Sequence, residues 1–122
     1  MDVLRDVMST TLVTVEPHAT VAEAAELMSI HHIGAALVVA GDTLHGIFTE
    51  RDIVRALAAE HDAAHHTAAD WMSRDPITMH PDAPIAEARD RMLAEGFRHI
   101  PILEGGRLVG IVSLRDLSGR LG

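Results

Sequence analysis

The residue types in this sequence that are best suited to hold a ligand are a hydroxyl and a carboxylate that occur together twice. Thr49 is followed at the third position by Asp52, and Ser113 is followed at the same spacing by Asp116. Each hydroxyl lies where an apolar strand gives way to a predicted helix, so unpaired backbone N–H groups at the helix start are expected to be available to a phosphate. Each carboxylate can accept hydrogen bonds from two neighbouring hydroxyls, as a ribose offers them.

Arginines next to the two carboxylates add to this chemistry. Arg51 directly precedes Asp52 and Arg115 directly precedes Asp116, so each could add a charge-assisted contact to an anionic ligand. The same spacing is also that of a helix capping box, which accounts for the hydroxyl and the carboxylate without a ligand. Capping does not account for the glycine and two apolar residues that precede the hydroxyl in both places, so both interpretations stay open.

Both motifs lie at matching places in a long internal repeat. Residues 7–53 recur at 71–117 without a gap, and 15 of the 47 aligned positions are identical. Unrelated sequences of average composition would share roughly three or four. The chain is therefore one supersecondary unit written twice. The identical pairs include Met8 and Met72, Pro17 and Pro81, Gly46 and Gly110, and Asp52 and Asp116.

Each repeat is predicted to run strand, helix, strand, strand, helix. In the first repeat, a β-branched stretch stopped by Pro17 predicts a strand, and Thr20 with Glu23 forms a capping box before an alanine-rich helix. Two apolar runs separated by a glycine-containing turn predict a hairpin, and a second helix follows it. These elements are expected at residues 11–15, 21–31, 35–39, 44–48 and 50–61.

The second repeat has the same order of elements. Pro84 is placed to open its first helix and Gly96 to end it. Its elements are expected at residues 76–79, 85–95, 99–103, 108–112 and 114–119, and a leading helix at 2–8 is expected to match residues 68–72. We therefore divide the chain into residues 1–62, the first repeat with its leading segment, and residues 63–122, the linker and the second repeat, which together form one tandem module.

The repeated motif resembles that of the CBS domain family, which is named for cystathionine β-synthase. The resemblance covers nearly the whole chain, and it implies an α+β fold in which two tandem β-α-β-β-α repeats pack through their sheets as a pseudo-twofold pair and leave two clefts. It also implies that these clefts bind AMP, ADP or ATP, or alternatively S-adenosylmethionine or NAD. The segments that carry the resemblance are Gly46-Ile47-Phe48-Thr49, Gly110-Ile111-Val112-Ser113 and Arg98-His99-Ile100-Pro101-Ile102.

The resemblance implies that the two clefts are not equivalent. In family members that bind nucleotides, basic residues at the positions of Arg98 and His99 reach the phosphates of the ligand that the same repeat holds. The first repeat has Gly34 and Ala35 at the matching positions. A phosphorylated ligand is therefore expected to prefer the second repeat. The alternative for Arg98 is a solvated surface arginine.

In the family, each cleft is completed by the first strand of the other repeat. By this resemblance, Thr11 and Val13 complete the site built on Asp116, whereas Asp75 and Ile77 complete the site of the first repeat. Adenine is expected to be held by apolar side chains and backbone groups, which many residue types could supply. The sequence therefore does not distinguish among the adenosine-containing ligands.

Composition argues against several classes of function. The formal charge of −8 opposes binding to a nucleic acid, and only one tryptophan and two phenylalanines could stack on bases. No apolar run approaches the length of a membrane span, and the first residues lack the layout of a signal peptide. The chain has no cysteine, so disulfides and thiolate chemistry are excluded and a cytoplasmic protein is expected.

Neither catalysis nor metal binding is predicted. No serine, threonine or lysine stands with a base and an orienting group in the sequence, so the chain is not expected to be an enzyme. The segment between the repeats carries His61, His65 and His66, but beyond Asp62 and Asp70 it offers no further ligand, so it is interpreted as a polar linker. No metal and no required cofactor are expected.

The resulting hypothesis is a stand-alone regulatory module that binds an adenosine-containing ligand and signals to an unidentified effector protein. Alanine- and methionine-rich helix faces offer more apolar surface than one internal interface covers, and members of the family commonly dimerise. A homodimer is therefore expected. Two alternatives stay open: a dimerising protein-interaction scaffold without a small ligand, and a metal- or pH-responsive histidine module.

Overall fold

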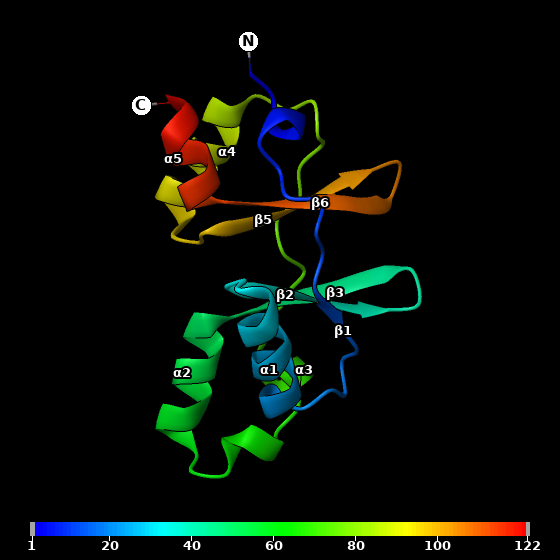
Figure 1. Cartoon of the computed structure of the whole chain (residues 1–122), viewed down its shortest axis with the longest axis vertical. Coiled ribbons are helices and arrows are strands. Elements are labelled where there is room, and N and C mark those ends of the chain that lie inside the picture. The colour runs from blue at the N-terminus through cyan, green and yellow to red at the C-terminus, as the bar shows by residue number, and fades with distance from the viewer. Residues whose placement is uncertain (1, 122) are drawn as a thin grey trace. The chain divides into compact units, whose positions relative to one another are not determined.

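The computed structural model describes residues 2–121 and the side chains of residues 2–118. Contacts divide the chain into two compact units, Val13–Pro76, called the central unit below, and Met1–Leu12 with Ile77–Gly122, called the terminal unit. Figure 1 labels most of the helices and strands of each unit. The first residues of each repeat, with the segment before them, are thus grouped with the other repeat. The division into residues 1–62 and 63–122 concerns the sequence repeats and stays a prediction.

The central unit is built on a four-stranded sheet. Its strands, in sheet order, are β1 (Thr14–Val15), β2 (Ala35–Ala40), β3 (Thr43–Thr49) and β4 (Ser73–Arg74). β1 is parallel to β2, and the other neighbouring strands are antiparallel. The predicted hairpin is therefore present, and Gly41 in its turn has a φ of 60°, a left-handed conformation that glycine adopts without strain.

The first helix of the central unit begins where its capping box predicts. α1 (Val21–His31) follows Thr20, whose Oγ1 accepts a hydrogen bond from the Glu23 backbone N–H at 3.0 Å. Glu23 Oε1 accepts a hydrogen bond from the Thr20 backbone N–H at 2.9 Å, and this bond is the main reason that the pKa of Glu23 lies below its ordinary value. α1 ends at His32, which has a left-handed φ of 55°.

The core of the central unit draws on both sides of the linker. The remaining helices are α2 (Glu50–Ala59), the 3-10 helix η2 (Ala63–His65) and α3 (Ala68–Trp71). Ala68 of α3 is buried in the same hydrophobic cluster as the apolar stripe of α1, so the segment before the second repeat completes the core of the first. Other members of this cluster are Val21, Ala24, Met28 and Phe48.

The terminal unit contains the second hairpin and its helices. They are β5 (His99–Glu104), β6 (Arg107–Ser113), α4 (Ile85–Glu95), α5 (Leu114–Leu121) and the 3-10 helix η1 (Leu4–Asp6). α4 ends at Gly96, whose φ of 81° closes the helix as predicted. Leu4 is fully buried, so the leading segment completes this core. It packs in one cluster with Ile85, Met92, Ile100, Val112 and Leu117.

One predicted element is absent, and two others are much shorter than expected. Residues 76–79 are not a strand, because Met79 makes only an isolated parallel bridge with Ile102. Pro76 has no backbone donor and Pro81 follows closely, which limits pairing on both sides. The strand expected at 11–15 is confined to β1, and the leading helix expected at 2–8 is only η1. Within residues 2–121, no helix combines the length and apolarity needed to cross a membrane.

Candidate functional site

The first candidate motif lies at the junction of β3 and α2 in the central unit. Thr49 caps α2, and its Oγ1 accepts a hydrogen bond from the Asp52 backbone N–H at 3.4 Å. Asp52 Oδ2 accepts hydrogen bonds from the Thr49 backbone N–H at 2.9 Å and from the Thr49 hydroxyl at 3.2 Å. The aspartate is buried, with 3% of the residue exposed. The capping interpretation therefore describes the contacts of this motif.

A further contact occupies the other oxygen of Asp52. Arg55 Nη1 donates to Asp52 Oδ1 at 2.9 Å, from one turn further along α2. The Arg55 guanidinium also lies over the ring of Trp71, with its Cζ 5.9 Å from the ring centroid. Both oxygens of this carboxylate are therefore hydrogen-bonded within the central unit. Sequence reasoning did not identify Arg55, although the arginine stands three residues after the aspartate.

The second motif, at the junction of β6 and α5, has the same capping contacts in a different environment. Asp116 Oδ2 accepts a hydrogen bond from the Ser113 backbone N–H at 2.8 Å, and Ser113 Oγ accepts one from the Asp116 backbone N–H at 3.2 Å. Asp116 is exposed. With the described residues it forms no ion pair. Its Oδ1 can therefore accept hydrogen bonds from a ligand.

The terminal unit brings Arg98 and His99 to the start of α5. The Arg98 carbonyl oxygen accepts a hydrogen bond from the Leu114 backbone N–H at 2.8 Å, and His99 lies opposite Ser113 in the hairpin. Arg98 is exposed. Two basic residues, a hydroxyl and a carboxylate that were singled out from the sequence thus lie together within one unit.

The central unit has the same backbone arrangement without the basic side chains. The Gly34 carbonyl oxygen accepts a hydrogen bond from the Glu50 backbone N–H at 3.1 Å, and Ala35 lies opposite Thr49. In both α2 and α5, two of the first three backbone N–H groups are already hydrogen-bonded within the protein. The expectation of unpaired N–H groups at the helix start is therefore wrong for these two groups of each helix. A phosphate would therefore depend mainly on basic side chains, which are missing at Gly34 and Ala35.

Four predicted site residues come from the first segments of the two repeats. Thr11 is exposed in the terminal unit, and Val13 is buried in the central unit. Asp75 is exposed in the central unit, with a φ of 46°, and Ile77 is half-buried in the terminal unit. Their assignment to ligand sites stays a prediction. The same is true of two exposed arginines in the first turns of α2 and α5, Arg51 and Arg115.

The linker histidines are in two different states. His61 and His65 are exposed, as expected for a polar linker, whereas His66 is half-buried. The His66 ring stacks on that of Trp71 with the centroids 6.5 Å apart, and its Nδ1 accepts a hydrogen bond from Trp71 Nε1 at 3.3 Å. The interpretation as a solvated linker therefore does not hold for His66, which helps to fix the indole.

Among the described residues, a group of three possible metal ligands lies in the terminal unit. Donor atoms of His80, Asp82 and Glu104 lie within 4.8 Å of one another. Arg5 already joins the two carboxylates, with its Nε 3.2 Å from Asp82 Oδ1 and its Nη2 3.0 Å from Glu104 Oε2. The hydrogen bond to Glu104, followed by that to Asp82, raises the pKa of Arg5. An arginine thus supplies the positive charge here, and the absence of a metal site stays a prediction.

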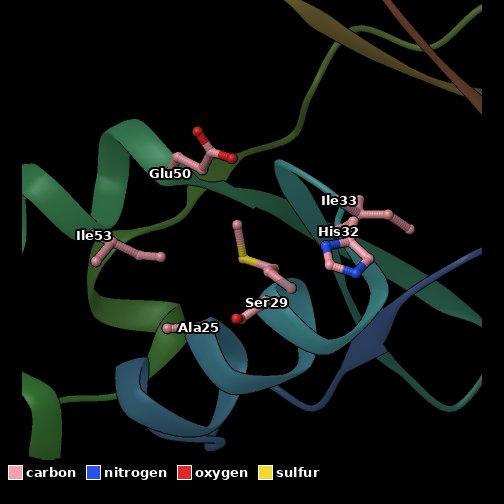
Figure 2. Close-up of a pocket in the computed structure, with 7 residues that line it drawn as sticks. Ala25, Ser29, His32, Ile33, Glu50 and Ile53 are labelled. Carbon is pink, nitrogen blue, oxygen red and sulfur yellow. The ribbon is translucent and has the colours of Figure 1, made fainter.

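A groove of about 410 Å³ opens between α1 and α2 of the central unit. Figure 2 shows Glu50 and Ile53 of α2 facing Ala25, Ser29 and His32 of the α1 segment across this groove. It contains none of the predicted site residues. Sequence reasoning missed it because it forms where two helices that are separated by a hairpin approach each other. The lining is completed by Met28 and Ile33.

Both repeats of the sequence match one family of proteins. The model of the CBS domain matches residues 4–59 and again residues 68–122. The CBS domain-containing protein YhcV of Bacillus subtilis is 35% identical to this chain over 118 residues, which cover 97% of this chain and 84% of that protein.

Solved structures have the same fold. The crystal structure of the CBS-domain containing protein ATU1752 from Agrobacterium tumefaciens matches with a TM-score of 0.93 and 29% identity, covering 99% of this chain and 100% of that one. The CBS domain pair of protein MJ0100, in complex with 5′-methylthioadenosine and S-adenosyl-L-methionine, matches with a TM-score of 0.89 and 29% identity, covering 99% and 96% of the two chains. The predicted family resemblance and α+β fold class are confirmed.

Proposed function

Because this chain belongs to the CBS domain family, we propose that it is a regulatory module that binds an adenosine-containing ligand and signals its occupancy to an effector protein. One observation carries the proposal: an exposed carboxylate, a hydroxyl and two basic residues lie together at the start of α5. The complex of the MJ0100 domain pair, at 29% identity, with two adenosyl compounds supports it. No catalytic step and no required cofactor form part of the proposal.

In this proposal Asp116 receives the ribose. One of its oxygens caps α5, and the other can accept hydrogen bonds from ribose hydroxyls. Ser113 stands at the positive end of α5, which favours an anionic group. Arg98 can pair with the charge of a phosphate and His99 can donate a hydrogen bond to it, so AMP, ADP or ATP suits this site better than S-adenosylmethionine or NAD.

The second repeat is proposed to hold the phosphorylated ligand more tightly than the first. The first repeat has Gly34 and Ala35 where the second has Arg98 and His99. Its carboxylate, Asp52, is also buried and hydrogen-bonded at both oxygens. Both differences weaken the attraction of the first repeat for a nucleotide.

Thermal unfolding with a panel of ligands tests the proposed function. A ligand that binds only the folded state stabilises it by about 2.7 kcal/mol when its concentration is a hundredfold above Kd. We expect a higher Tm with AMP, ADP or ATP and no comparable change with inorganic phosphate, which controls for charge alone. If S-adenosylmethionine, NAD and the nucleotides all leave Tm unchanged, the scaffold alternative is favoured. A rise confined to Zn²⁺ would favour the histidine module.

We also propose that two copies of the chain associate through α1 and α2 of the central unit. Ile30 of α1 is 61% exposed, and Val54 and Leu57 of α2 are 67% and 49% exposed. The groove of Figure 2 lies between the same two helices. Burial of apolar surface contributes about 25 cal/mol per Å², and a symmetric pair of copies brings the same face from both partners.

A further inference from the structure

The two motif carboxylates differ in how many of their oxygens the protein itself uses. Asp52 has Oδ2 hydrogen-bonded to Thr49 and Oδ1 to Arg55, and its side chain is only 5% exposed. Asp116 is exposed, and the described residues hydrogen-bond only its Oδ2. A ribose can therefore reach an open oxygen in the second repeat, whereas in the first it must displace a guanidinium.

The arginine that makes this difference is absent from the second repeat. The position that matches Arg55 in the repeat is Gly119, and Arg120, which follows it, lies outside the residues whose side chains the structure describes. The two repeats thus share the hydroxyl, the carboxylate and the capping contacts, but among the described side chains only Asp52 is paired with an arginine of its own helix.

We propose that Arg55 is a specificity-determining residue that holds Asp52 and keeps the first repeat from binding a ribose as tightly as the second. This inference rests on the proposed function. A charge-assisted hydrogen bond from a guanidinium is about twice as strong as a neutral one, so a ribose hydroxyl competes poorly with Arg55 for Oδ1. Without Arg55, Asp52 regains an acceptor position like the one that Asp116 offers.

Trp71 supplies a reporter for this contact. It is the one tryptophan of the sequence, and the Arg55 guanidinium lies over its ring at 5.9 Å from the centroid. His66 stacks on the indole and accepts its hydrogen bond, which holds the ring in place when Arg55 moves. Displacement of Arg55 by a ligand is therefore expected to change the fluorescence of Trp71.

The variant Arg55→Gln removes the charge and keeps a good helix former. In calorimetric titrations with AMP, we expect the weaker of two binding events to become about three- to tenfold tighter in this variant, while the tighter event is unchanged. In the unmodified protein, Trp71 fluorescence is expected to change with the weaker event, and in the variant this change is lost.

The matched control is Arg91→Gln. It breaks another ion pair within a helix, between Arg91 Nε and Glu95 Oε2 at 2.8 Å in α4. We expect it to alter neither binding event. Thermal unfolding without AMP shows whether each variant is folded. If Arg55→Gln is not, Arg55→Met, which keeps an unbranched apolar side chain next to Trp71, takes its place.

The outcomes separate this inference from the proposed function. If the weaker event is unchanged or weakened by Arg55→Gln while the tighter event persists, the inference is overturned and the proposed function stands. If the unmodified protein and both variants bind no AMP, ADP, ATP, S-adenosylmethionine or NAD, the proposed function fails and the inference fails with it.

Discussion

Asp52 and Asp116 occupy matching positions and make the same capping contact. Comparing the two alanine variants therefore separates an effect on ligand binding from an effect on helix capping. Asp116→Ala removes an exposed acceptor and is expected to weaken AMP binding by about 30- to 150-fold, or about 2–3 kcal/mol. Asp52→Ala is expected to leave the tighter site nearly unchanged and to destabilise the fold by about 1 kcal/mol, because it deletes a cap and unpairs Arg55. Calorimetry and thermal unfolding measure the two effects. Equal losses of affinity would contradict the difference between the repeats.

Arg98 is expected to act on the phosphate of the ligand and not on its nucleoside. Its guanidinium can pair with a phosphate, and adenosine offers no such charge. Arg98→Ala is therefore expected to weaken AMP binding about tenfold while adenosine binding stays within about twofold. Titration with both compounds checks this, and Arg107→Ala, an exposed arginine of the same hairpin, is the control. A similar loss for AMP and adenosine would mean that Arg98 acts through the fold.

At the scale of single residues, the sequence predicts correctly those site residues that local structure brings together. Ser113 and Asp116 are joined by a capping box, and His99 reaches them through the register of one hairpin. It does not predict that Asp52 is buried or that Arg55 lies over Trp71, because these contacts depend on the return of α3 toward α2. Whether a carboxylate is buried and paired is thus harder to predict than which element carries it.

At the scale of elements, a glycine in each returning strand lies against the first residues of the other repeat. A Cβ on Gly46 would lie 2.5 Å from Met72 Sδ and 2.6 Å from the Ser73 carbonyl oxygen. The carbonyl belongs to β4, which pairs with β3 at this point. The repeated glycine, methionine and serine therefore form one packing arrangement.

The second arrangement is slightly looser. A Cβ on Gly110 would lie 2.6 Å from Met8 Sδ and 3.0 Å from the Ser9 carbonyl oxygen. A side chain can move aside more easily than a backbone, so Gly46→Ala is expected to destabilise the fold by about 1–3 kcal/mol and Gly110→Ala by less. Chemical denaturation of the two variants tests the order. A larger loss for Gly110→Ala would show that the backbone contact is not the decisive one.

Helices and hairpins were predicted well because their signals are local. α1 and α4 have the predicted bounds, set by a capping box in one case and by Pro84 and Gly96 in the other. The segments at 2–8 and 76–79 were predicted poorly. Their conformation depends on distant partners, since Val3 pairs with Pro84 and Met79 with Ile102.

At the scale of the whole molecule, the exposed apolar face of α1 and α2 is the basis for a homodimer. Light scattering at tens of micromolar is expected to give twice the chain mass of 13.2 kDa. Placing charge on this face with the double change Val54→Asp and Leu57→Asp is expected to give a folded monomer, because burying two carboxylates costs more than the interface gains. Thr43→Asp, at the exposed start of β3, is expected to remain dimeric. A monomeric mass for the unmodified protein would refute the proposal.

The grouping of chain segments into units also sets an order of events during synthesis. The central unit is one uninterrupted stretch, so all of its core residues are present once Pro76 has left the ribosome. Leu4 is made much earlier, but it packs with residues as late as Leu117. The central unit can therefore finish folding before the terminal unit does, and Leu4 stays uncovered until Leu117 has been made.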